Sequence, residues 1–393
     1  MTFLNDLYPE NSSVTQLFSI FMSIMLGFVL NAPDVRAAGV DAAPDSLKQA
    51  FVDDFLVGAA VSRSQIMGED PAAMDLVKQQ FNTLTAENVM KWEKIHPLED
   101  QYDWEAADAL VAFSQANDMC LAGHVLVWHQ QVPDWVFKDA DGNPASRELL
   151  LSRMKSHIET VVGRYQGKVQ SWEVVNEALN EDGSLRQTPW LDQIGADYIA
   201  KAFEFAHRAD PGAKLYYNDF NLYKPEKRAG AALLVRQLQE MAIDIHGIGM
   251  QGHYGLDNPQ MSDFEDSIKA FAGLSVEVYI TELDMSVLPF PDQADWGADI
   301  TVNLELNKQY NPYADGLPPE VAKQQADRYA ELFRIMLAHR DVIGRVTFWG
   351  VNDGHSWKNG WPMSGRTDYP LLLDRDNRPK PVFYEVVGLA GNR

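Results

Sequence analysis

The sequence has little cysteine and lacks the short motifs that mark several large enzyme classes. A single thiol, Cys120, excludes an intramolecular disulfide and a zinc site built from several thiolates. The G-x-x-x-x-G-K phosphate loop, the G-x-S-x-G nucleophile elbow and the H-E-x-x-H zinc helix are all absent. Runs rich in His or Asp that could form a metal loop are also missing, so we expect no catalytic metal and no cofactor.

Positive charge is scarce as well. The 33 Lys and Arg residues stand against 56 Asp and Glu residues, which gives a formal net charge of −23. A field of this sign repels phosphate backbones and anionic lipid surfaces. We therefore expect no nucleic acid partner and no stable membrane association of the mature protein.

An apolar run covers residues 17–30 near the N-terminus. Its 14 residues are too few to span a bilayer comfortably, but they match the core of a signal peptide. Val35 and Ala37 suit cleavage after Ala37, so we predict a signal peptide over residues 1–37 and a secreted or periplasmic protein. Residues 1–16 hold no Lys or Arg, which departs from the usual positive start, and an uncleaved anchor or a misplaced start codon stays open.

Residues 45–393 are expected to form a single domain, because no low-complexity linker interrupts them. Short β-type runs alternate there with longer amphipathic runs, as is typical of βα units. The candidate strands cover residues 56–62, 81–87, 121–128, 169–177, 214–220, 245–253, 275–284 and 345–353. Candidate helices include residues 104–118, 146–165, 194–210, 227–242 and 319–341. This rhythm predicts an α/β fold with a single (β/α)8 TIM barrel, and a doubly wound open sheet is the alternative.

Most candidate strands begin with apolar residues and end with polar or aromatic ones. These end residues are Glu87, His124, Trp128, His129, Asn176, Glu177, Asn218, Gln251, His253, Glu282 and Trp349. In a barrel the carboxyl ends of the strands converge on one face, where active sites lie. An open sheet gives no reason for this pattern, so we favour the barrel.

Two carboxylates, Glu177 and Glu282, end the fourth and seventh candidate strands. A barrel places them across its mouth from each other. Cleavage of a glycosidic bond needs such a pair, with one group protonated and the other ionised, and close negative charges push the two pKa values apart. The alternative is a structural ion pair between each Glu and an Arg or Lys.

Seven blocks follow one another along the chain: TAENVMKW (85–92), GHVLVWHQQVPDW (123–135), WEVVNEAL (172–179), YYNDFN (216–221), GIGMQGH (247–253), ITELD (280–284) and FWGVNDGHSW (348–357). In this order they resemble the endo-β-1,4-xylanases of glycoside hydrolase family 10. The resemblance covers about residues 50–388. The family implies a retaining (β/α)8 enzyme that acts on xylan and xylo-oligosaccharides, and we expect a monomer.

The resemblance also implies roles for individual residues. Glu177 would be the acid/base and Glu282 the nucleophile. Asn176 would bind the sugar 2-hydroxyl, and His253 would hold the nucleophile with Asp284 behind it as an orienting partner. The remaining substrate-binding residues implied by the matching blocks are Glu87, Asn88, Lys91, His124, Gln131 and Gln251, with Trp128, Trp349 and Trp357 as walls of the cleft.

Two features depart from the family pattern or lie outside it. Phe220 stands where the family usually has Tyr, which puts one contact on the leaving-group side in doubt. The stretch 289–320 is unusually long and acidic, and as a loop after a barrel strand it is expected to rim the cleft on the leaving-group side.

Two other functions remain open. A cellulase or mannanase of the same clan would share the Asn-Glu end of the fourth strand, although the E-N-x-x-K set at 87–91 favours xylan. A non-catalytic sugar-binding barrel would keep the tryptophans and lose one carboxylate. Both carboxylates are present, which argues against it.

Overall fold

The computed structural model describes residues 46–390 as a closed barrel of parallel strands. The strands are β1 (Leu56–Val61), β2 (Thr83–Ala86), β3 (Cys120–Gly123), β4 (Ser171–Asn176), β5 (Lys214–Asp219), β6 (Gly247–Met250), β7 (His253–Gly255), β8 (Glu277–Ser286) and β9 (Ile343–Phe348). They follow the order β6-β5-β4-β3-β2-β1-β9-β8, and pairing of β6 with β8 closes the ring. The predicted (β/α)8 barrel is confirmed, while the signal peptide predicted over residues 1–37 lies outside the described residues.

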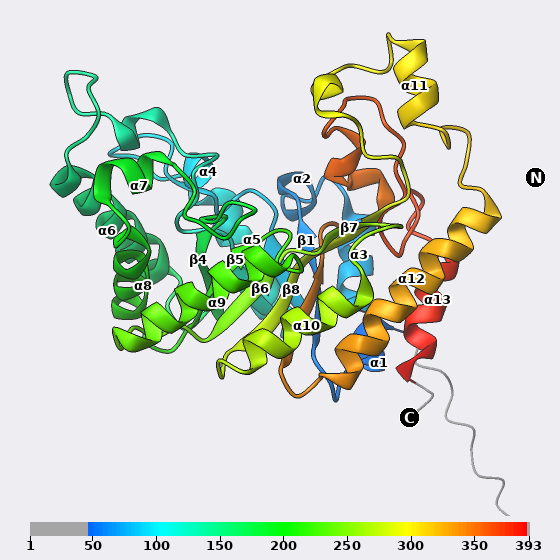
Figure 1. Ribbon diagram of the computed structural model, residues 1–393, viewed down its shortest axis with the longest axis horizontal. Coiled ribbons are helices and arrows are strands. Elements are labelled where there is room, and N and C mark those ends of the chain that lie inside the picture. Colours follow the sequence, from blue (N-terminus) through cyan, green and yellow to red (C-terminus); the bar gives the residue numbers. More distant parts are fainter. Residues whose placement is uncertain (1–45, 391–393) are drawn as a thin grey trace, which may run out of the picture. The chain divides into compact units, whose positions relative to one another are not determined.

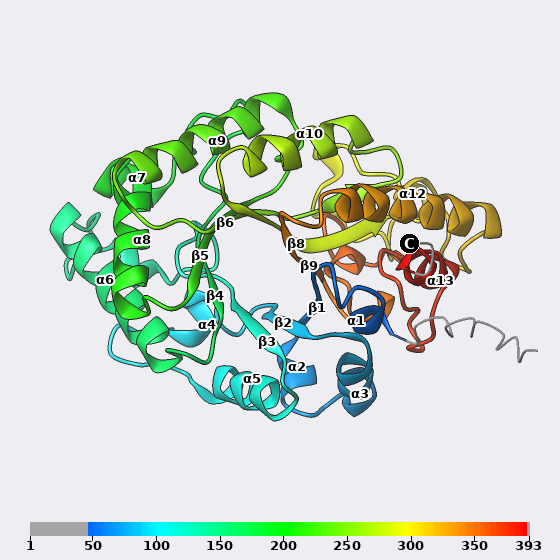
Figure 2. The same ribbon diagram turned by 90° about the horizontal axis from the view of Figure 1, so that it is seen from below.

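The helices form a ring around this barrel, which Figure 1 shows from the side and Figure 2 end-on. The longer ones are α3 (Pro71–Gln80), α5 (Glu105–Ala116), α6 (Arg147–Arg164), α8 (Tyr198–Ala209), α9 (Pro225–Glu240), α10 (Met261–Ala272), α12 (Pro319–Ala338) and α13 (Pro381–Gly388). The shorter ones are α1 (Leu47–Ala50), α2 (Arg63–Ile66), α4 (Trp92–Ile95), α7 (Pro189–Ile194) and α11 (Leu304–Tyr310). Within residues 46–390, none of these helices has the length and apolar character needed to cross a membrane.

Local sequence signals set the helix ends. The Ser146 hydroxyl accepts a hydrogen bond from the Leu149 backbone N–H at 3.2 Å and so caps α6. Pro319 occupies the first turn of α12, where a missing N–H costs no hydrogen bond. Because both signals can be read from the chain, the predicted helices 146–165 and 319–341 agree closely with α6 and α12.

Strands β3 and β4 approach each other closely at Gly123. A Cβ atom at Gly123 would lie 2.1 Å from the Trp172 ring, so only glycine leaves room for this fully buried indole. The contact fixes the register in which Gly123 pairs with Trp172. That register in turn places the ends of both strands at the mouth of the barrel.

The predicted strand 121–128 is too long, because β3 ends at Gly123. The chain pairs with β4 again at Val127, opposite Val175. Between the two pairings it advances four residues, from Gly123 to Val127, while β4 advances three, from Trp172 to Val175. The extra residue makes a bulge, and bulges beside active sites redirect side chains.

The predicted strand 245–253 is also corrected. It divides into β6, which ends at Met250, and the short β7, which begins at His253 and pairs with the far end of β8. Gly252 separates them with a φ of 91°, a conformation that favours glycine. The break sends Gln251 and His253 to the mouth of the barrel from different backbone directions.

A buried histidine pair links α6 to the chain near α4. His157 is fully buried, its ring lies 3.7 Å from the Trp92 ring in a parallel stack, and its Nδ1 is 3.1 Å from Nδ1 of His96. Burial, reinforced by His96, holds the pKa of His157 well below its ordinary value. The folded protein therefore keeps His157 neutral under conditions in which the unfolded chain takes up a proton.

This difference predicts a loss of stability in acid. Below about pH 6.5 the unfolded state binds one more proton at His157 than the folded state, so the free energy of unfolding falls as the pH drops. His157→Gln keeps a polar partner for His96 but does not titrate. Its unfolding free energy, measured in urea between pH 6.5 and 4.5, should fall less steeply than that of the wild type by up to about 1.4 kcal/mol per pH unit. Equal slopes would contradict the prediction.

Candidate active site

Glu282 lies in the middle of β8, buried, with both carboxylate oxygens bonded. Asn218 Nδ2 donates to Oε1 at 2.9 Å, and His253 Nε2 lies 3.1 Å from Oε2. Burial acts to raise the pKa of Glu282, but the hydrogen bond and the charge of His253 outweigh it and hold the pKa below its ordinary value. An ionised carboxylate fixed at both oxygens has the properties of a positioned nucleophile.

His253 connects Glu282 to a second carboxylate, Asp284. The Nδ1 atom of His253 lies 3.0 Å from Asp284 Oδ2. Burial acts to lower the pKa of His253, yet Asp284 and Glu282 together raise it to about 9, so the ring is an imidazolium at neutral pH. Trp357 Nε1 donates to Asp284 Oδ2 at 2.8 Å, and Lys358 Nζ is 3.3 Å from its other oxygen. The predicted placement of Asp284 behind His253 is present in the structure.

Glu177 follows the last residue of β4 and is partly exposed. Its φ of 56° is unusual for a residue with a side chain and lifts it out of the strand direction. The backbone is held on both sides, because Glu177 N–H donates to the Asn218 carbonyl at 2.9 Å and Ala178 N–H to the Tyr217 hydroxyl at 3.0 Å. Residues in such conformations persist where surrounding contacts fix them, and they cluster at functional sites.

Three amide side chains join the two candidate catalytic carboxylates. Gln251 Nε2 lies 3.0 Å from Glu177 Oε1 and 3.2 Å from Asn176 Oδ1. Asn218 Nδ2 lies 3.3 Å from the same Asn176 oxygen and 2.9 Å from Glu282 Oε1. Glu177 and Glu282, 105 positions apart in the chain, thus belong to one hydrogen-bonded cluster at the mouth of the barrel.

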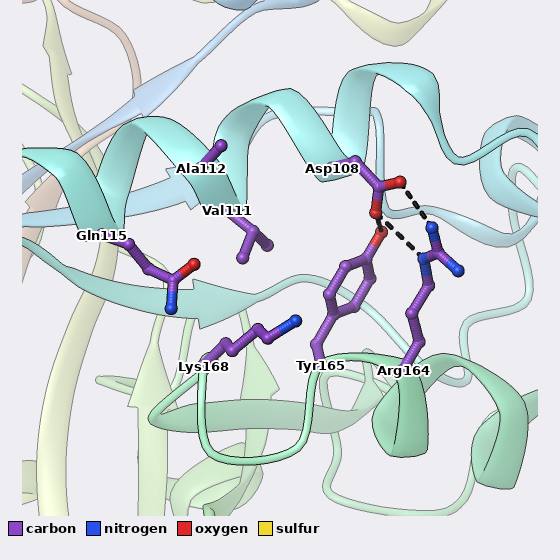
Figure 3. Close-up of a pocket in the computed structure, with 7 residues that line it drawn as sticks. All are labelled: Asp108, Val111, Ala112, Gln115, Arg164, Tyr165 and Lys168. Carbon is purple, nitrogen blue, oxygen red and sulfur yellow. Dashed lines mark hydrogen bonds and ion pairs between the residues drawn. The ribbon is translucent and has the colours of Figure 1, made fainter.

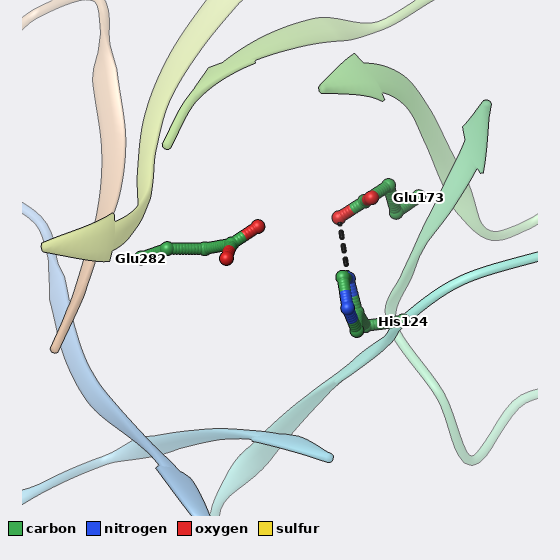
Figure 4. A group of neighbouring side chains, drawn as sticks. All are labelled: His124, Glu173 and Glu282. Atoms are coloured by element: carbon green, nitrogen blue, oxygen red, sulfur yellow. Dashed lines mark hydrogen bonds and ion pairs between the residues drawn. The ribbon is translucent and has the colours of Figure 1, made fainter. Parts of the chain in front are cut away.

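Glu173 is a buried member of this cluster that the sequence analysis did not identify. Its Oε2 atom lies 2.9 Å from His124 Nδ1, and Figure 4 shows Glu282 facing this pair from the opposite strand. Burial raises the pKa of Glu173, although His124 opposes the shift. A charged residue inside the otherwise apolar run of β4 was the available signal, since buried acids are rare without a partner.

His124, Glu173 and Glu282 could in principle hold a cation. Each offers a ligand atom, and these atoms lie within 4.8 Å of one another. However, His124 is already bonded to Glu173, and both oxygens of Glu282 are occupied by Asn218 and the positively charged His253. We therefore interpret the group as a hydrogen-bonded wall of the site.

A second polar group forms around Lys91. Its Nζ atom donates to Asn88 Oδ1 at 3.0 Å and to Gln131 Oε1 at 2.8 Å, and it lies 5.0 Å from the centre of the Trp128 ring. Burial lowers the pKa of Lys91, while Glu282 and Glu87 act to raise it. Burial also raises the pKa of neighbouring Glu87. Five residues predicted to bind substrate are thus brought together here.

The other two predicted tryptophans line the central cluster. The Trp349 ring lies 5.2 Å from the His124 ring and 6.4 Å from the His253 ring, and Trp349 is mostly buried. The Trp357 ring lies 4.9 Å from His253 and remains partly exposed. Trp357 therefore offers an accessible apolar face, while Trp349 mainly supports the histidines.

Phe220, which departs from the family pattern, packs on cations. Lys227 Nζ lies 3.5 Å from the centre of its ring, and the Arg186 guanidinium lies 5.5 Å away. Lys227 is fully buried and pairs with Asp219 at 2.9 Å. A ring face suffices for these cation–π contacts, so the missing phenol leaves this support intact.

A cavity of about 350 Å3 lies between α5 and the end of α6, away from the candidate active site. Figure 3 shows three of its polar residues bonded to each other: Asp108 accepts hydrogen bonds from Arg164 and from the Tyr165 hydroxyl. Its lining contains none of the residues described above.

Comparisons with known proteins show the family of this chain. The family model for glycosyl hydrolase family 10 matches residues 46–389. The chain is 46% identical to endo-1,4-beta-xylanase A of Xylanibacter ruminicola, over 88% of this chain and 93% of that protein. It is 42% identical to a beta-1,4-xylanase of Dictyoglomus thermophilum, over 95% and 99% of the two chains. The chain belongs to glycosyl hydrolase family 10.

Solved structures show the same relationship. A GH10 endoxylanase from a sugarcane soil metagenome aligns with a TM-score of 0.83 and 40% identity, covering 88% of this chain and all of the other. A second neighbour, a mutant in complex with xylotriose, aligns with a TM-score of 0.78 and 38% identity over 88% and 99% of the chains.

Proposed function

We propose that this protein is a retaining endo-1,4-β-xylanase, with Glu282 as nucleophile and Glu177 as acid/base. The observation that carries the proposal is the pair of differently held carboxylates in one network. Glu282 is bonded at both oxygens, by Asn218 and His253. Glu177 accepts hydrogen bonds at Oε1, from Gln251 at 3.0 Å and from Asn176 at 3.5 Å. The xylanase relatives and the neighbour bound to xylotriose support xylan as the substrate.

In the first step, an oxygen of Glu282 attacks the anomeric carbon as the bond to the leaving oxygen breaks. Glu177 donates its proton to that oxygen, which departs as a hydroxyl of the shortened chain. The imidazolium of His253 keeps Glu282 ionised until the attack, because it stabilises the charged form. The product is a glycosyl ester on Glu282.

In the second step, Glu177 removes a proton from water, which attacks the anomeric carbon and frees Glu282. Once Glu282 is an ester its negative charge is gone, so the cluster no longer disfavours a second anion. Asn176 would contact the 2-hydroxyl of the same sugar, where hydrogen bonds strengthen toward the transition state.

The remaining residues would bind the sugar chain. His124, Lys91, Gln131 and Gln251 would hold the sugar at the cleavage point, and Glu87 with Asn88 would hold the next sugar on the non-reducing side. Trp128, Trp349 and Trp357 would supply apolar faces. Since xylose lacks the hydroxymethyl group of glucose, close-fitting Trp and Lys side chains can admit xylan and exclude cellulose by steric cost.

Proton NMR of the first-formed product tests the proposal. A reaction that retains configuration should release the β-anomer from xylan, before mutarotation mixes the two forms. Reducing-sugar release should be high on xylan and low on carboxymethylcellulose and mannan under the same conditions. An initial α-anomer would exclude the double displacement, and a preference for either other polymer would exclude the substrate.

A further inference from the structure

Three exposed aromatic side chains gather at one place on the cleft side of β8 and β9. Phe290 is 61% exposed, Trp296 44% and Trp361 41%. Their ring centres lie 5.6 to 5.9 Å apart in tilted or edge-on arrangements. Phe290 and Trp296 belong to the loop after β8, and Trp361 belongs to the segment after β9. We call these three residues the aromatic platform.

The platform is continuous with the candidate active site. The Trp361 ring stacks on the Trp357 ring with centres 4.8 Å apart and an interplanar angle of 23°. Trp357 in turn donates to Asp284, the partner of His253. A row of rings therefore runs from the residues that hold Glu282 to the exposed loop.

Hydrogen bonds and a small hydrophobic core hold the loop that carries Phe290 and Trp296. Gly297 N–H donates to the Pro362 carbonyl at 2.7 Å, and Ile300 N–H to the Ser364 carbonyl at 3.1 Å. Ile300, Tyr310 and Met363 form a small hydrophobic core beneath it. The Trp296 indole is fixed by a 3.1 Å hydrogen bond to the Pro291 carbonyl. The rings are thus pre-positioned, which lowers the entropy lost when a ligand binds.

A contiguous patch of exposed apolar side chains, such as these three rings, can mark a binding site. A sugar ring suits this one, because the apolar face of a pyranose packs on indole and phenyl rings while its hydroxyls stay in water. The neighbouring carboxylates of Asp292, Asp295 and Asp299 disfavour an anionic ligand such as a glucuronate branch. A neutral sugar of the xylan backbone suits both the aromatic rings and the negative charge of these carboxylates.

We infer that Phe290, Trp296 and Trp361 form an additional sugar-binding subsite, which holds a backbone xylosyl unit beyond the sugars gripped at the cleavage point. The inference rests on the proposed xylanase function and extends it. It also refines the expectation for the loop 289–320, whose aromatic residues are joined to the cleft through Trp357 and Trp361.

Substrate length provides the test. Phe290→Ala/Trp296→Ala should reduce kcat/KM on xylohexaose and linear xylan by about tenfold, equivalent to about 1.4 kcal/mol. The same variant should hydrolyse an aryl β-xylobioside at the wild-type rate, since that substrate is too short to reach the platform. Trp296→Phe should keep most of the activity on long substrates because it keeps a ring face. Val302→Ala, which removes an exposed apolar side chain from the same loop, is the matched control and should change neither rate.

The outcomes separate the subsite from the proposed function and from other occupants. A wild-type protein inactive on both substrates would refute the proposed xylanase function. With an active wild type, equal losses on short and long substrates, or no loss on either, would overturn the subsite. A loss confined to arabinose- or glucuronate-branched substrates would overturn the assignment to a backbone sugar. A change from dimer to monomer in light scattering of the double variant would show that the platform instead covers a second copy.

Discussion

Replacing Glu282 with alanine should lower kcat on xylan by about 10⁴-fold or more, while binding of xylo-oligosaccharides stays measurable. In the proposed mechanism the variant lacks the oxygen that attacks the anomeric carbon, and Glu177, which follows β4, cannot replace it because it acts on the leaving oxygen. The sugar contacts of Lys91 and His124 would remain. Steady-state rates on xylan, with titration calorimetry using xylotriose, would measure both quantities.

Glu277→Ala is the matched control for this experiment. Glu277 begins β8, five residues before Glu282, and its partners are Lys214 and the Tyr279 hydroxyl. It should keep near-wild-type activity. If Glu282→Ala turned over xylan at a rate close to that of the control, Glu282 would not be the nucleophile. If it lost binding together with activity, the defect would be in folding or substrate contact, and the assignment would lose its support.

The placement of Glu177 and Glu282 at the mouth of the barrel could be predicted because it depends on local patterns, and His253 lies there too, although it begins β7 rather than ending a strand. Apolar runs of strand length followed by a polar residue identify the strand ends, and parallel barrel topology brings those ends to one face. The same reasoning placed Asn176 and Gln251 near the carboxylates, where they now link Glu177 to Asn218 and Glu282. Barrel topology therefore predicts which strand-end residues lie near each other, even when many residues separate them in the chain.

Other features depend on register, which no local pattern specifies. Glu173 meets His124 because each directly follows a residue of the Gly123–Trp172 pair, and a register shift of one residue would change which side chains face each other. The packing of Phe220 on Lys227 depends likewise on how α9 lies against β5. The aromatic platform joins two loops whose tryptophans, Trp296 and Trp361, are about 65 positions apart in the chain. Tertiary contacts set the conformation of such long loops, so the sequence alone does not predict that these residues meet.

Glu177→Ala should affect substrates according to their leaving groups. Hydrolysis of xylan needs protonation of a sugar alkoxide, so its kcat/KM should fall by about 10² to 10⁴-fold, the usual contribution of a general acid. An aryl xylobioside with a nitrophenolate leaving group departs without a proton, so formation of the glycosyl ester should be nearly unaffected. Because Glu177 also activates water in the proposed second step, the ester should accumulate and the reaction should show a burst of nitrophenolate followed by slow turnover.

Added azide distinguishes this role from a merely structural one. A small anion that needs no general base can enter the space left by the carboxylate and attack the ester, so it should restore the slow turnover and yield a β-glycosyl azide. Glu181→Ala removes a nearby carboxylate bonded to Lys224 and Lys227, and should show neither the burst nor the rescue. Equal losses on xylan and on the aryl substrate, with no effect of azide, would mean that Glu177 shapes the site without transferring the proton. In that case another group on the leaving-group side of the barrel mouth would have to supply it.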